Sequence, residues 1–318
     1  MRYGMMRNVT QKTQRLMLLD TASLYFRAYF GVPDSVKAPD GTPVNAVRGL
    51  LDFITRLVHD HHPTDLVACM DADWRPQWRV DLIPSYKAHR VAEEKPTGTP
   101  DEEEIPDTLS PQVPIIEAVL DAVGITRVGV EGYEADDVIG TYTSGAATPV
   151  DIVTGDRDLY QLVDDEKQRR VLYPVKGVGT LQITTETFLR DKYGVDGSGY
   201  ADMATLRGDP SDGLPGVPGI GEKTAAKLLA EYGTLAGIVE AANDPASKLT
   251  PTQRKRLTEA HDYLAVAPKV VQVATDVPLP DLPTALPGKP RDPELLEHLG
   301  TRWGLGGPLQ RLLTTLSA

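Results

Sequence analysis

The sequence contains a single cysteine, Cys69, among 318 residues. No disulfide can therefore form within the chain, and no zinc site made of cysteines can be built from it. Aromatic residues make up only 6% of the sequence, and no apolar run approaches the roughly 18 residues of a membrane-spanning helix. We therefore expect a cytoplasmic protein with no membrane partner and with room for about two domains.

Residues 1–15 are basic and contain no acidic residue. The apolar run that follows them spans only residues 16–19, whereas the apolar segment of an export signal needs about 7–15 residues. We therefore predict that residues 1–15 form a flexible basic extension; the alternative is a misassigned start.

The chain as a whole is acidic, with 33 lysines and arginines against 45 aspartates and glutamates and a formal charge of −12. This total on its own argues against a polyanionic partner. Nine of the acids, however, belong to one predicted metal site, and the remaining charges are nearly balanced. The acidity therefore does not exclude a nucleic acid.

Short apolar runs that end in an acid or a glycine-containing turn alternate with segments of helical period. The runs are residues 16–20, 66–71, 125–130 and 150–156, and the helical segments include 45–61 and 111–123. This alternation predicts a doubly wound, mostly parallel α/β sheet. Ligands of such sheets bind at the carboxyl ends of the strands, which is where the acids fall.

The organisation beyond the strands divides the chain further. We predict an α/β core over residues 16–190, interrupted by a mobile proline-rich excursion over 91–114. A helical region over 191–276 follows, and a proline-rich segment then leads, within 277–318, to helices that pack back on the core. The predicted later helices are 199–207, 222–232, 235–242, 252–266, 293–299 and 308–316.

Nine acids from five chain segments are predicted to meet at one edge of the sheet. They are Asp20, Asp71, Glu134, Asp136, Asp137, Asp156, Asp158, Asp209 and Asp212. Each small group has an ordinary explanation, such as a helix cap or a turn. As a set, unpaired like charges this close would raise one another's pKa and destabilise the fold, and bound cations would remove the problem.

The ligand type indicates the ion. Carboxylates without a cluster of histidine or cysteine favour Mg²⁺ or Mn²⁺ over Zn²⁺. Nine acids are too many for one magnesium, whereas two ions about 3.5–4 Å apart serve in-line phosphoryl displacement. The predicted substrate is a phosphodiester.

Two further features suit phosphate. A glycine-rich hairpin opens the helix 222–232 and resembles a helix-hairpin-helix, whose free N–H groups hold DNA backbone; the alternative is an ordinary helical turn of the core. Lys87 and Arg90 are three residues apart, which predicts one helical face that could neutralise transition-state charge; the alternative is a solvated helix face. The hairpin residues of interest are Gly216, Gly219, Gly221, Lys223, Thr224 and Lys227.

Five motifs occur in an order that is similar to that of the bacterial 5′-nuclease, or flap endonuclease, family. They are LLDTASLYFRAY (18–29), YKAHR (86–90), YEADDVIG (133–140), TGDRDLYQL (154–162) and GDPSDGLPGVPGIGEKTA (208–225). The family includes the N-terminal domain of DNA polymerase I and stand-alone 5′-3′ exonucleases. No polymerase region follows, so the chain resembles the stand-alone form.

The resemblance implies a PIN-like core with a helical arch at about 80–114, and two-metal hydrolysis of DNA in replication and repair. It implies one Mg²⁺ or Mn²⁺ on Asp20, Asp71, Glu134, Asp136 and Asp137, and another on Asp156, Asp158, Asp209 and Asp212. Lys87 and Arg90 would be catalytic, and a potassium ion could occupy the hairpin. DNA would be bound by Arg27, Arg79, Tyr86, Gly216, Gly219, Gly221, Lys223, Thr224 and Lys227. The expected partner of a monomeric enzyme is DNA with a 5′ flap, nick, gap or 5′ end, or an RNA primer.

Three other classes stay open. A PIN-type ribonuclease would cleave RNA hairpins and DNA flaps equally. A structural protein with a degenerate site would bind branched DNA without cutting it. A phosphatase for small molecules would have no use for a hairpin that grips DNA.

Overall fold

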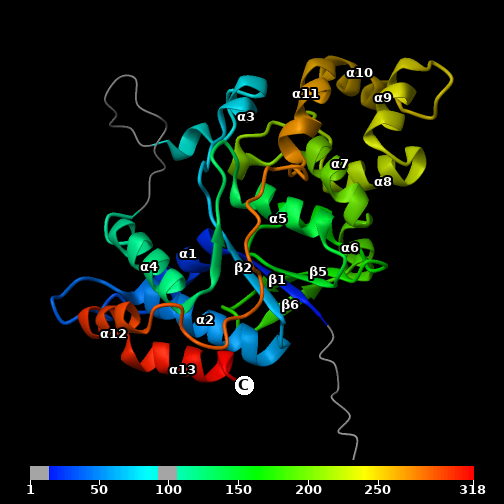
Figure 1. The fold of residues 1–318 in the computed structure, drawn as a ribbon. Coiled ribbons are helices and arrows are strands. Elements are labelled where there is room, and N and C mark those ends of the chain that lie inside the picture. The colour runs from blue at the N-terminus through cyan, green and yellow to red at the C-terminus, as the bar shows by residue number, and fades with distance from the viewer. Residues whose placement is uncertain (1–13, 92–105) are drawn as a thin grey trace, which may run out of the picture.

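The computed structural model describes residues 14–91 and 106–318. Most of the predicted basic extension and of the proline-rich excursion therefore lies outside the described residues. Six strands form one sheet in the order β3-β2-β1-β4-β5-β6 (Figure 1). Strands β1 to β5 pair in parallel, and β6 pairs antiparallel with β5. Their bounds are β1 Leu16–Asp20, β2 Asp65–Cys69, β3 Thr126–Val128, β4 Val150–Val153, β5 Arg169–Pro174 and β6 Leu181–Thr184.

Helices follow most strands and then dominate the second half of the chain. In the first half they are α1 Thr21–Gly31, α2 Asn45–His61, α3 Gln77–Leu82, η1 Ala88–Arg90, η2 Ser110–Gln112, α4 Val113–Val123, α5 Ala135–Gly145 and η3 Asp158–Leu162. In the second half they are α6 Glu186–Tyr193, α7 Gly197–Arg207, η4 Pro210–Asp212, α8 Glu222–Tyr232, α9 Leu235–Asn243, α10 Pro251–Glu259, α11 His261–Val271, α12 Pro293–Arg302 and α13 Gly306–Leu316.

Both faces of the sheet are buried, as the alternation along β1 shows. Leu16 and Leu18 join the core that includes α5 and the helical region. Met17 and Leu19 join a second core formed with α2, α4, α12 and α13. Because successive side chains of a strand point to opposite faces, a strand covered on both sides is apolar throughout. The doubly wound α/β prediction is confirmed.

Two elements differ from the prediction. The hairpin β5–β6 was not predicted, because β5 begins with the charged pair Arg169 and Arg170 and lacks a clear apolar run. The predicted helix over 252–266 is two helices, α10 and α11, which change direction at Ala260. Neither proline nor glycine marks that break, so the sequence pattern alone did not reveal it.

The C-terminal helices return to the α/β core. Helix α12 packs against α4, and α13 packs against α2 (Figure 1). The segment before them runs beside β2, where the Leu66 N–H donates to the Thr284 carbonyl over 2.8 Å. Helix α6 crosses the predicted boundary between residues 190 and 191. Within the described ranges, no helix has the length and apolar character to cross a membrane.

Candidate active site

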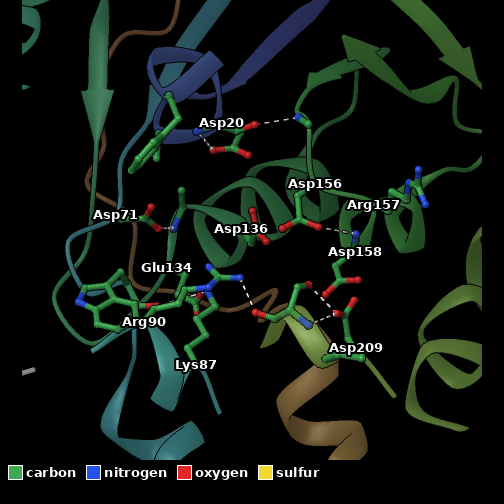
Figure 2. A pocket seen from close by; sticks show the side chains of 18 of the residues that line it. Asp20, Asp71, Lys87, Arg90, Glu134, Asp136, Asp156, Arg157, Asp158 and Asp209 are labelled. Carbon is green, nitrogen blue, oxygen red and sulfur yellow. Dashed lines mark hydrogen bonds and ion pairs between the residues drawn. The ribbon is translucent and has the colours of Figure 1, made fainter. Parts of the chain in front are cut away.

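A cavity of about 710 Å³ opens at the carboxyl ends of β1, β2 and β4. Seven of the nine predicted carboxylates line it, together with both predicted cations Lys87 and Arg90 (Figure 2). The seven are Asp20, Asp71, Glu134, Asp136, Asp156, Asp158 and Asp209. Parallel strands bring residues that are far apart in sequence to one edge of the sheet, so the topology itself gathers the acids.

Asp20 ends β1 and caps α1. Its carboxylate accepts a hydrogen bond from the Ser23 N–H over 3.1 Å and another from the Thr154 hydroxyl over 2.6 Å. Burial raises the pKa of Asp20 to about 7 against these hydrogen bonds, and the charges of Asp71 and Asp156 raise it further. The metal-free pocket therefore holds this carboxylate partly protonated near neutral pH.

Asp71, which follows β2, and Asp136, in the first turn of α5, face the same cavity. Asp71 is open to solvent within the cavity and accepts a hydrogen bond from the Ala135 N–H over 2.8 Å. Protein on its other sides desolvates Asp71 and raises its pKa. Asp136 makes no hydrogen bond or ion pair with its side chain anywhere in residues 14–91 and 106–318. Burial, followed by the charge of Asp156, raises the pKa of Asp136 well above its usual value.

The turn after β4 and the loop after α7 supply three more carboxylates. Asp156 accepts a hydrogen bond from the Asp158 N–H over 2.8 Å, and Asp209 accepts one from the Ser211 N–H over 2.8 Å. Burial, then the charge of Asp156, raises the pKa of Asp158 well above its usual value. These acids form the second half of the cavity wall, next to Arg207.

Glu134 and Lys87 form an ion pair in the part of the cavity wall that carries the two cations. Lys87 donates to Glu134 through a short charge-assisted hydrogen bond, and the Tyr86 hydroxyl donates to the same carboxylate over 2.6 Å. Burial alone would lower the pKa of Lys87, but the surrounding acidic groups, Glu134 first and then Tyr86, Asp212 and Asp71, together outweigh it and raise the pKa well above its usual value. Lys87 is therefore a permanent cation at the edge of the cavity.

Arg90 and Asp212 make the second ion pair of this wall. The Arg90 guanidinium donates to the Asp212 carboxylate and to the Ser211 carbonyl, each over 2.7 Å. Asp212 is buried behind the cavity wall, and burial raises its pKa to about 6 despite the nearby charge of Lys87. The Lys87 N–H also donates to the Asp212 carbonyl over 2.9 Å. This pairing fixes the base of the predicted arch to the loop that carries Asp209.

The prediction that Lys87 and Arg90 share one face of a helix is wrong, although both side chains line the cavity. Lys87 has a left-handed backbone with φ of 48°, and only the short turn η1 follows it. A lysine in this conformation ends regular structure. This turn and the ion pairs with Glu134 and Asp212 bring the two cations to the same cavity wall.

Asp137 does not line the cavity, which corrects its predicted place among the metal ligands. It is 0% exposed, and four donors occupy its two carboxylate oxygens. The donors are Arg79 Nη1 at 2.7 Å, Arg79 Nη2 at 2.7 Å, the Glu134 N–H at 3.1 Å and the Ala274 N–H at 2.8 Å. A carboxylate has about four acceptor positions, so Asp137 has none left for an ion.

Two residues predicted to bind DNA are also buried. Arg79 is 2% exposed, and its guanidinium is held by Asp137, Glu134 and the Val270 carbonyl. Tyr86 is 4% exposed and uses its hydroxyl on Glu134. Neither side chain can reach DNA in this arrangement. Both instead position Glu134.

The glycine-rich hairpin connects α7 to α8 as predicted. Gly216 has φ of 64°, and a Cβ there would lie 2.5 Å from the backbone of Arg207, so only glycine fits. Lys223 and Lys227 are exposed one turn apart on α8, beside the half-buried Thr224. The Gly219 carbonyl accepts a hydrogen bond from Arg256 over 3.0 Å. This guanidinium already provides a cation to the hairpin, so the proposed site contains no potassium ion.

Several residues of the cavity wall were not predicted from the sequence. Arg157 lies between Asp156 and Asp158, Arg207 ends α7, and Tyr173 comes from the unpredicted strand β5. Thr154 fixes both Asp20 and the turn, since the Asp156 N–H donates to its hydroxyl over 2.8 Å. Position beside the acidic motifs could have revealed the arginines, whereas Tyr173 required the sheet order.

The donor set fits hard divalent cations. The cavity offers carboxylate oxygens from several elements. In the described part of the chain, the side chains of Asp136 and Asp158 make no hydrogen bond and no ion pair. Within that part, no three acids already have the spacing that would hold a metal ion. Burial first, and then the charges of neighbouring carboxylates, raise the pKa of several members, and a bound cation would favour their ionised form.

Comparison with known proteins places the chain in a family. A model of the 5′-3′ exonuclease N-terminal resolvase-like domain matches residues 15–194, and a model of the 5′-3′ exonuclease C-terminal SAM fold matches residues 195–294. A 5′-3′ exonuclease of Streptomyces coelicolor is 80% identical over 302 residues, which cover 95% of this chain and 100% of the relative. The chain belongs to the 5′-3′ exonuclease family. The predicted family is therefore confirmed.

Other members of this family agree. A 5′-3′ exonuclease of Mycobacterium tuberculosis is 50% identical, over 95% of this chain and 97% of the relative. DNA polymerase I of Mycobacterium bovis is 38% identical over 95% of this chain but only 32% of its own length. Among solved structures, the T5 D15 protein co-crystallised with metal ions has a TM-score of 0.63 at 16% identity and covers 95% of this chain and 97% of its own. That likeness supports the fold.

Proposed function

We propose that this 5′-3′ exonuclease family member is a divalent-metal-dependent 5′ nuclease. It hydrolyses DNA phosphodiester bonds at 5′ flaps, nicks, gaps and 5′ ends, in replication and repair, and acts as a monomer. The observation that carries this proposal is the cavity in which seven carboxylates and two cations meet at the carboxyl edge of the sheet. The catalytic core of Rad2, a protein of similar fold that was solved in complex with DNA substrate, adds support.

The carboxylates would hold Mg²⁺ or Mn²⁺ in two groups. We assign Asp20, Asp71, Glu134 and Asp136 to one ion, and Asp156, Asp158 and Asp209, with Asp212 at the edge, to the other. Divalent ions in such a site activate water and neutralise the charge of the phosphoryl group. Lys87 and Arg90 add positive charge at the cavity wall, where the scissile phosphate would lie.

The helical region would hold the duplex away from the cavity. The free N–H groups at the start of α8 and the exposed ammonium groups of Lys223 and Lys227 suit phosphate oxygens. These contacts read no base, so recognition would depend on the shape of the DNA and on a free 5′ end. An RNA primer paired with DNA offers the same phosphodiester linkage and is a further substrate to test.

The test is cleavage of a 5′-labelled double-flap DNA with Mg²⁺, with Mn²⁺ and with chelator. We expect a metal-dependent cut near the flap junction that Asp156→Asn abolishes, because the variant loses a charge that would hold the ion. Asp60→Asn is the matched control, since Asp60 is an exposed partner of Arg56 near the amino end of β2, at the opposite end of the sheet. Equal turnover by Asp156→Asn and Asp60→Asn would refute the metal assignment.

The same experiment separates the alternatives. Tight flap binding without any cut would favour a structural branched-DNA protein. Equal cleavage of RNA hairpins would favour the PIN-type ribonuclease. Titration of Mn²⁺ into the protein, followed by calorimetry, tests ion binding without reference to activity, and Asp156→Asn should lose part of the bound metal.

A further inference from the structure

We infer that Arg157, Tyr173 and Arg27 form a phosphate subsite at the side of the cavity. The subsite takes a DNA phosphate other than the one that is cleaved, and the inference therefore rests on the proposed function. Arg157 comes from the turn after β4, Tyr173 from β5 and Arg27 from α1. Three elements that are distant in sequence thus supply one small cationic surface.

The two arginines share one aromatic ring. The guanidinium carbon of Arg27 lies 5.5 Å from the centroid of the Tyr173 ring, and that of Arg157 lies 5.9 Å from it. Stacking on an aromatic ring orients a guanidinium but leaves its N–H donors free to bind another group. Tyr173 therefore orients the guanidinium groups of both arginines.

Neither arginine has a carboxylate partner in the described residues. Arg90 pairs with Asp212, and Arg207 lies 3.6 Å from Asp209, so arginines elsewhere on this wall do find acids. Arg157 lies between Asp156 and Asp158 in sequence, yet its side chain extends away from both (Figure 2). Two permanent cations on one ring, neither paired with an acid in these residues, suit an anionic ligand.

The local backbone makes room for this arrangement. A Cβ at Gly155 would lie 2.7 Å from Arg27 Nε and 2.8 Å from the Ser23 hydroxyl. Glycine at this turn therefore lets the Arg27 guanidinium approach the strand end. The Gly155 N–H is fixed by the Ser23 hydroxyl over 2.9 Å, which ties the turn to α1.

The subsite adjoins the acidic cavity. Ser23, Gly155, Arg157 and Tyr173 line the same cavity as the carboxylates, so a strand whose scissile phosphate lies at the acids would pass this wall. Arginine binds phosphate oxygens through two parallel hydrogen bonds, which suits a backbone phosphate better than a base edge. The ligand is thus a phosphodiester of either the cleaved or the template strand.

The experiment measures flap-DNA affinity as a function of salt, with Ca²⁺ in place of Mg²⁺ and with a gel check that the DNA is intact. We expect Arg157→Ala to weaken binding several-fold and to lower the salt slope by about 1. Tyr173→Phe keeps the ring and should bind like the wild type, whereas Tyr173→Leu should lose part of the affinity. Arg56→Ala, which removes the same charge from an exposed position on α2, is the matched control.

Substrates with one neutral methylphosphonate locate the contact. Moved along the cleaved strand and then the template strand, the neutral group should weaken wild-type binding at one position that no longer matters in Arg157→Ala. That position identifies the strand. If no position shows this coupling, or if Arg157→Ala and Arg56→Ala have the same salt slope, the subsite is refuted while the wild type still cleaves. If the wild type does not cleave, the proposed function itself fails.

Discussion

Replacing Asp20 with asparagine should stabilise the metal-free protein while it abolishes cleavage. Asp20 is 5% exposed and lies among other carboxylates, and its pKa is raised from 3.8 to about 7, first by burial and then by the charges of Asp71 and Asp156. Asparagine keeps the shape and the hydrogen bond from the Ser23 N–H but carries no charge. The fold then no longer has to hold an ionised group in this place.

The magnitude follows from linkage. Each pKa unit is worth about 1.4 kcal/mol, so a native pKa near 7 against an unfolded value near 3.8 costs the ionised protein about 4 kcal/mol. The unfolded chain loses the proton first as pH rises, so stability falls between pH 4 and pH 7 and stays low above it. The asparagine amide loses the hydrogen bond that Thr154 donates, which costs about 1 kcal/mol. The net gain of Asp20→Asn is about 3 kcal/mol at pH 8 and about zero at pH 4.5.

Urea unfolding of metal-free protein at pH 8 and pH 4.5 measures this difference. Asp60→Asn, on an exposed carboxylate, should change stability by less than about 0.5 kcal/mol at either pH. Adding Mn²⁺ at pH 8 should stabilise the wild type more than Asp20→Asn, because the ion binds the ionised carboxylate. A destabilised Asp20→Asn at pH 8, or a difference that does not depend on pH, would refute the account of Asp20.

Other predictions concern the remaining parts of the site. Arg79→Met should cost about 3–5 kcal/mol in urea unfolding, because it leaves the buried Asp137 without its cation, and the double variant with Asp137→Leu should recover part of this loss; full stability of Arg79→Met would contradict the role of the pair. Lys87→Ala should slow single-turnover cleavage more than it weakens flap binding, since the cation acts chiefly in the transition state; a fall in affinity at an unchanged bound rate would make Lys87 a docking residue. Gly216→Ala should weaken flap binding because its Cβ meets backbone, whereas Gly221→Ala, whose Cβ meets open space, should bind as the wild type does; equal affinity of the two variants would remove the argument from the hairpin geometry.

The gathering of the acids was predictable because strand ends determine it. Asp20, Asp71 and Asp156 each follow a parallel strand, and the sheet brings them together whatever the details of packing. The separation of Asp136 from Asp137 was not predictable in the same way. Both lie in the first turn of α5, and the direction of each depends on where Arg79 and Ala274 come to lie.

A local signal did exist for Asp137. Glu134 and Asp137 have the spacing of a capping box, in which the first residue caps the helix and the fourth accepts the N–H of the first. The structure contains the hydrogen bond from the Glu134 N–H to the Asp137 carboxylate, over 3.1 Å. The spacing of three, which also suits a shared metal-binding face, thus corresponds to a helix cap here. The buried Arg79 then donates to both carboxylate oxygens of Asp137.

The metal-free cavity limits its own negative charge in two different ways. Glu134 at the cavity wall and Asp137 behind it form ion pairs with Lys87 and Arg79. Asp20, Asp136 and Asp158 form no ion pair within residues 14–91 and 106–318, and burial above all raises their pKa values. A divalent ion should therefore bind the second group with release of protons, and its apparent affinity should rise from pH 6 to pH 8. The number of protons released per bound ion therefore reports how many protonated carboxylates the ion makes ionise.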